Sequence, residues 1–239
     1  MGYFKVGQYF YNFKQKEVEE DINFIAEICF NGRIKRGQQI SRRQYYNNKN
    51  AVLKKYQMTD YDANMDGELE KHLNGLTKQH CVPRYLFDSV LDYLHSRKII
   101  RPSYYKMQDL VSSAIAREKK RISNKLYLIL DNSMRKALDE LLELEDLFYK
   151  LSIVKSDQRD FTTHEIRKTV EKNQLLRDLY HQSVEVIEQL GISQQNVNQY
   201  SVHKLKKLSD VNLKRLYLLC YANNRFLKIN DHLNCKLYA

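Results

Sequence analysis

Tryptophan is absent from this chain, and its 239 residues include only two prolines and seven glycines. So few helix-breaking and turn-forming residues favour long helices joined by few tight turns. Uninterrupted apolar runs are also short: none reaches the roughly 18 residues that a membrane helix needs. Because no stretch has the pattern of a signal peptide either, we expect an intracellular protein that does not bind membranes.

Cysteine is scarce and dispersed, at positions 29, 81, 220 and 235, with no CxxC pair and no His/Cys spacing typical of zinc sites. We expect these thiols to be reduced and buried. Residues 58–67 resemble a calcium loop but lack its terminal Glu, so we expect no metal and no other cofactor. The GxSxG, GxGxxG, P-loop and HExxH motifs are missing. The sequence therefore predicts neither an enzyme nor a small-molecule substrate.

Apolar residues recur at helical spacing along most of the chain, and the alternation typical of strands is nowhere sustained. Ser41, Ser103, Ser193 and either Thr162 or Thr163 stand where helix caps are expected. These signals predict an all-α, multi-helix bundle with helix-turn-helix-like units. The predicted helices cover residues 17–30, 42–56, 68–80, 84–96, 103–129, 132–151, 163–190, 193–208 and 210–229.

Positive charge is in excess, with 40 Lys and Arg against 29 Asp and Glu, and it is concentrated in two segments. Residues 31–57 hold eight basic residues and no acid. Residues 97–125 hold nine basic residues against Asp109 and Glu118, so the remainder of the chain is net negative. A lysine-rich proteome would spread such an excess evenly, whereas clustering favours a polyanionic partner such as nucleic acid.

Each basic segment has the outline of a DNA-reading element. The first segment has the order of a helix-turn-helix: a helix, a basic connector that contains glycine, and a basic helix. The connector is longer than the usual length of about three or four residues. An ordinary helical hairpin would give the same pattern. In the second, the Arg101-Pro102 turn leads into a helix capped by Ser103, with Tyr104 and Tyr105 in its first turn.

Several motifs resemble, in order and spacing, the amino-terminal region of the Tn-three family of replicative transposases. They are PRYLF at 83–87, IIRPSYY at 99–105, MQDLVS at 107–112 and REKKR at 117–121, followed by residues 160–161 and 215–221. The chain departs from the pattern at Met107, where the family has Leu. The resemblance extends to about residue 232, and residues 234–239 match nothing in it.

In that family the amino-terminal helical region is taken to bind the terminal inverted repeats of the transposon. Strand transfer belongs to a ribonuclease-H-like domain far downstream, which this chain lacks. The resemblance implies a fragment that begins inside the first domain, which agrees with the aromatic cluster in residues 1–15. It also implies a bacterial cytoplasmic, nucleoid-associated location. We divide the chain into a partial DNA-binding domain (1–80), a second helical DNA-binding domain with a linker (81–232) and a tail (233–239).

The predicted function is therefore sequence-specific binding of transposon-end double-stranded DNA, without catalysis by this chain. One alternative is a helical interaction module that pairs with an intact transposase or another acidic partner, and another is a non-functional gene remnant. The predicted DNA-binding residues are Arg33, Lys35, Arg36, Arg42, Arg43, Lys49, Lys54, Lys55, Arg101, Tyr104, Tyr105, Lys106, Gln108, Arg117, Lys119, Lys120 and Arg121.

Overall fold

The computed structural model describes Phe4, Phe10 and residues 14–33, 41–145, 148–149, 151, 155, 160–202 and 205–237. The fold is all-α, as the sequence predicts, and its contacts divide the chain into two compact units. Unit 1 comprises Met1–Asp66 and Ser89–Met107, and unit 2 comprises Gly67–Asp88 and Gln108–Ala239. The division into two DNA-binding domains at residue 80 was made on functional grounds, and it stays a prediction. Among the described helices, none is long and apolar enough to cross a membrane.

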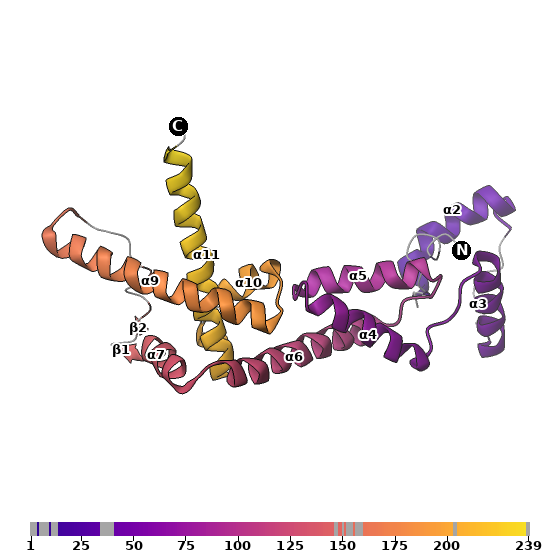
Figure 1. Cartoon of the computed structure of the whole chain (residues 1–239). Helices are drawn as coiled ribbons and strands as arrows, with labels where there is room; N and C mark the ends of the chain where they lie inside the picture. Colours follow the sequence, from indigo (N-terminus) through magenta and orange to yellow (C-terminus); the bar gives the residue numbers. More distant parts are fainter. Residues whose placement is uncertain are drawn as a thin grey trace. The chain divides into compact units, whose positions relative to one another are not determined.

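Unit 1 contains two separate helices and parts of two others (Figure 1). Its elements are η1 (Gln15–Val18), α2 (Glu19–Phe30), α3 (Arg42–Tyr56), η2 (Ala63–Met65), the second half of α5 (Pro83–Ser96) and the first turn of α6 (Tyr104–Ile129). Phe4, Leu53 and Ile100 form a small buried core, against which Phe10, Val52, Tyr56 and Met58 pack. The core thus joins α3 to the segment that leads into α6.

Much of the apolar surface of α2 is exposed. Ala26 is its buried residue, whereas Phe24 and Ile28 are 64% and 65% exposed. Cys29 is exposed too, so the prediction that it is buried was wrong. Cys81 and Cys220 are buried, and burial raises the pKa of the Cys81 thiol to about 11. The side chain of Cys235 lies outside the described residues.

Unit 2 is built around α11, against which α9, α10 and α7 pack (Figure 1). Its elements are α4 (Asp66–Thr77) from Gly67 on, the start of α5, α6 from Gln108, α7 (Asn132–Leu142), β1 (Leu144–Glu145), β2 (Phe148–Tyr149), α9 (Thr163–Leu190), α10 (Gln194–Ser201), η3 (Leu205–Lys207) and α11 (Val211–Leu237). Leu126, Leu176, Val197 and Leu216 are among its buried core residues.

Local chemistry explains where several of these helices begin and end. The Thr162 and Ser193 hydroxyls accept hydrogen bonds from backbone N–H groups of α9 and α10, as a helix cap does. Gly191 ends α9 in a left-handed conformation, with φ of 65°. The predicted helix 132–151 was too long, because Glu143 turns to extended backbone and β1 and β2 then pair antiparallel. The predicted helix 193–208 is likewise split into α10 and η3.

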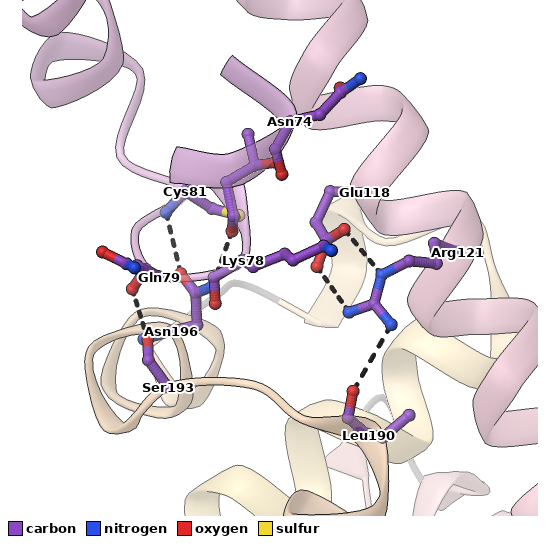
Figure 2. A network of polar contacts seen from close by, with 10 residues as sticks. Asn74, Lys78, Gln79, Cys81, Glu118, Arg121, Leu190, Ser193 and Asn196 are labelled. Carbon is purple, nitrogen blue, oxygen red and sulfur yellow. Dashed lines mark hydrogen bonds and ion pairs between the residues drawn. The ribbon is translucent and has the colours of Figure 1, made fainter. Parts of the chain in front are cut away.

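A buried amide joins α10 to the turn between α4 and α5 (Figure 2). The Asn196 side chain donates to the carbonyls of Thr77 (2.9 Å) and Lys78 (3.0 Å) and accepts from the backbone N–H of Cys81 (2.8 Å). The Ser193 hydroxyl adds a hydrogen bond to the carbonyl of Gln79. Two carbonyls at the end of α4 are thereby satisfied by a residue more than 100 positions away.

We predict that Asn196→Ala destabilises the protein by about 3 kcal/mol, because the Cys81 N–H and the Lys78 carbonyl lose the amide and the Thr77 carbonyl keeps only the hydrogen bond from the Cys81 thiol. Asn198→Ala, on the exposed side of the same helix, should change the free energy of unfolding by less than about 0.5 kcal/mol. Urea unfolding followed by circular dichroism measures both. Equal effects of the two substitutions would show that the buried amide does not hold the turn.

Candidate nucleic-acid interface

Helix α3 carries most of the first basic segment and is almost entirely exposed. Its start is set by a capping box, in which the Gln44 backbone N–H donates to the Ser41 hydroxyl (3.2 Å) and the Ser41 backbone N–H donates to the Gln44 side chain (3.1 Å). Leu53 is its buried residue, and Lys49, Val52 and Tyr56 are half-buried on the same face. The other faces, and the whole amino-terminal half, are therefore open to a partner.

The basic residues of α3 differ in what they already contact. The Lys49 ammonium pairs with Asp60 and lies 5.6 Å from the centre of the Phe10 ring, which leaves its side chain 19% exposed. Arg42 lies over the Tyr46 ring at 5.8 Å. Four basic residues of the helix are exposed: Arg42, Arg43, Lys54 and Lys55. Arg33 is exposed as well, whereas Lys35, Arg36 and the connector of the predicted helix-turn-helix lie outside the described residues.

A single parallel β-bridge between Thr59 and Ile99 joins the two basic segments. The Thr59 N–H donates to the Lys98 carbonyl and the Ile100 N–H donates to the Thr59 carbonyl, both at 2.9 Å. The chain enters this bridge through left-handed residues, Gln57 (φ 52°) and Lys98 (φ 56°), and the Lys98 ammonium donates to the Gln57 side chain (3.0 Å). The bridge places Arg101 near α3.

Beside the bridge is an open hollow of about 330 Å³, which we call the α3 hollow. Its walls come from four pieces of chain within unit 1. They are Phe10; Tyr45 and Lys49 of α3; Asp60 and Tyr61; and Ile100, Arg101 and Pro102. Two predicted DNA-binding residues from different segments, Lys49 and Arg101, therefore line one surface feature.

The first turn of α6 presents two aromatic rings to solvent. Tyr104 is 64% exposed and Tyr105 is 78% exposed, with their ring centres 6.2 Å apart. The Lys106 backbone N–H donates to Ser103, which caps the helix as predicted. The Lys106 ammonium is 2.6 Å from Asp66, and this hydrogen bond, with a second from Tyr61, holds the pKa of Asp66 below its usual value. Gln108 is exposed.

The basic run of α6 belongs to unit 2, and its residues differ in exposure and in the ion pairs that they form. Arg117 lies 3.6 Å from Glu70 and donates to Asn74 (3.4 Å). Lys119 is half-buried and Lys120 is exposed. Arg121 donates two hydrogen bonds, of 2.7 and 2.8 Å, to the buried carboxylate of Glu118, and a third of 3.4 Å to the Leu190 carbonyl (Figure 2).

The spacing of apolar residues along α6 could have revealed the Glu118–Arg121 ion pair from the sequence. Glu118 lies four residues after buried Ala114 and four before buried Ile122, so it falls on the buried stripe of α6. A buried carboxylate needs a cation, and Arg121 is the basic residue one turn further along. By contrast, no sequence signal identifies Phe10, Asp60 and Tyr61 as walls of the α3 hollow, because long-range pairing brings them together.

We predict that Arg121→Ala lowers the free energy of unfolding by about 2 kcal/mol or more, because the Glu118 carboxylate loses its partner. Lys120→Ala, at the exposed neighbouring position, should stay within about 0.5 kcal/mol of the parent chain. Chemical denaturation of the two variants gives the comparison. A Lys120→Ala effect as large as that of Arg121→Ala would contradict the structural role of the pair.

Comparison with known proteins adds one match. Residues 1–114 match a family model described as a domain of unknown function (DUF4158). No curated protein matches the chain. The matched region covers just under half of the chain and ends within α6. It is similar to that domain over all of unit 1, which includes α3, the β-bridge and the α3 hollow.

Proposed function

We propose that this chain binds double-stranded DNA at transposon ends, as a transposase-related DNA-binding protein without catalysis by its 239 residues. The exposed basic helix α3, joined by the β-bridge to the second basic segment, is the observation that carries the proposal. The specific target, terminal inverted repeats, rests on the resemblance of the motifs at 83–121 to the Tn-three transposases.

Electrostatics support the duplex as the partner. Residues 31–57 contain no Asp or Glu, so none of their basic residues can be neutralised by a neighbour on the same helix. Basic side chains contact phosphates and position a protein on DNA, while side chains near the start of a helix can reach base edges. Arg42, Arg43 and Gln44 stand at the start of α3, and all three are exposed.

Six exposed or half-buried basic residues of unit 1 form the proposed phosphate-contacting set: Arg33, Arg42, Arg43, Lys54, Lys55 and Arg101. The basic run of α6 contributes Lys119 and Lys120, whereas Arg121 is held by Glu118 and has a structural role. Tyr104 and Tyr105 are further candidate contacts because their rings are exposed.

A second candidate function is a protein-interaction module, and the exposed side of α2 favours it. Phe24, Ile25, Ile28 and Phe30 are each at least 47% exposed on that helix. Exposed large apolar side chains, such as Phe24 and Ile28 one turn apart, are typical of contact with another protein. Here the basic residues would bind an intact transposase or another acidic partner, and DNA affinity would not depend on α3.

We predict that the chain binds a transposon-end duplex with an affinity that falls steeply with salt. About six neutralised phosphates give a slope of log affinity against log salt near −5. Fluorescence anisotropy at several salt concentrations measures the slope, and a scrambled duplex tests specificity. An affinity that is independent of salt would contradict the proposal.

The double charge reversal Arg42→Glu/Arg43→Glu should weaken binding at least about tenfold and make the slope shallower by about 2. Its matched control is Arg167→Glu/Lys168→Glu, which reverses two adjacent exposed cations on α9 and changes the net charge equally. The control should keep most of the affinity. If α3 reversal leaves DNA binding unchanged, the protein-interaction function is favoured instead.

A further inference from the structure

We infer that the α3 hollow takes one unpaired nucleotide, so that the chain prefers DNA in which a duplex adjoins an unpaired strand. The inference rests on the proposed function, since it places the nucleotide next to DNA held by α3. It adds a ligand for the α3 hollow, whose Arg101 also belongs to the proposed duplex contacts.

The composition of the walls matches the parts of a nucleotide. Phe10, Tyr45 and Tyr61 supply three aromatic rings, on which bases of any sequence can stack. Arg101 supplies positive charge for a phosphate. The Asp60 carboxylate pairs with Lys49 but is 49% exposed, so it can also accept a hydrogen bond from a base amino group. A simple inorganic anion would make no use of the rings, and an apolar ligand would make no use of the charges.

The size of the hollow limits what can enter. Its volume of about 330 Å³ is at the lower end of the range for small-ligand sites. A base inside a duplex is stacked on both sides and cannot enter without leaving the helix. The occupant is therefore a single nucleotide from an unpaired strand.

Position along α3 connects the hollow to the proposed duplex contacts. Tyr45 follows Arg42 by three residues, which is about 4.5 Å along a helix axis. A strand whose phosphates contact Arg42 and Arg43 therefore passes close to the hollow. Tyr45 is 40% exposed, so its ring is accessible, while the Lys49–Asp60 ion pair fixes the wall beside it.

Tyr46 provides a matched control. It is also an exposed tyrosine, at 47%, and its ring lies edge-on to that of Tyr45 at 5.6 Å. It is not among the residues that line the hollow, and it lies under the Arg42 guanidinium instead. Tyr46→Ala therefore removes a similar aromatic ring from the same helix but leaves the walls of the α3 hollow in place.

The test compares a blunt duplex with the same duplex bearing four unpaired thymidines at the 3′ or the 5′ end of one strand. The full chain should bind one of the two overhang duplexes about tenfold more tightly than the blunt one, as expected for base–aromatic stacking. Tyr45→Ala should lose this gain, whereas Tyr45→Phe, which keeps the ring, and Tyr46→Ala should retain it.

A second readout uses 2-aminopurine in the overhang, whose emission should fall on binding to the parent chain and to Tyr45→Phe, but not to Tyr45→Ala. Equal affinity for blunt and both overhang duplexes overturns the inference and leaves duplex binding standing. Loss of the gain in Tyr46→Ala as well overturns it too. If no DNA binds, the proposed function fails and this inference fails with it.

Discussion

Two backbone hydrogen bonds at Thr59 determine the arrangement of unit 1. They pair Thr59 with Lys98 and Ile100, about 40 residues along the chain, and so fix the exit of α3 beside the entry to α6. Burial of Ile100 against Leu53 and Phe4 reinforces the pairing, because separating the strands would expose all three side chains. The bridge thus places the start of the second basic segment, residues 97–102, beside the end of the first, and the walls of the α3 hollow depend on it.

Helix α3 is stable although most of its surface is exposed, because its two ends and one face are held in place. An isolated helix of 15 residues is only marginally stable in water, and in this one Leu53 alone is buried. Its capping box at Ser41 and Gln44, its left-handed end at Gln57 and the contact of Leu53 with the small core support it. Stabilisation is therefore concentrated at the two ends and on one face. The remaining surface is exposed, and it is the surface that we propose contacts DNA.

Sequence patterns were sufficient for the elements that local chemistry specifies. The helical class, the caps at Ser41, Ser103, Thr162 and Ser193, and the end of α9 at Gly191 are confirmed because each depends on residues within one turn. The expected burial of Cys29 was wrong, since periodicity shows that a helix has an apolar face but not that another element covers it. The Thr59 bridge and the α3 hollow were not predicted, because a single β-bridge has no periodic signal and its partners lie far apart.

Counting charges overstates the surface that can contact DNA, and the structure shows why. Within α6, Glu118 engages Arg121 at a spacing of three residues, and two acids of α4, Asp66 and Glu70, engage Lys106 and Arg117 of α6. A cation held in this way must lose an existing partner before it contacts a phosphate. Residues 31–57 have no acid, and Asp60, just beyond them, pairs with Lys49. The similar net charges of the two basic segments therefore do not imply similar contributions to the proposed DNA binding: fewer ion pairs of α3 would have to break, so we expect its first turn to contribute most.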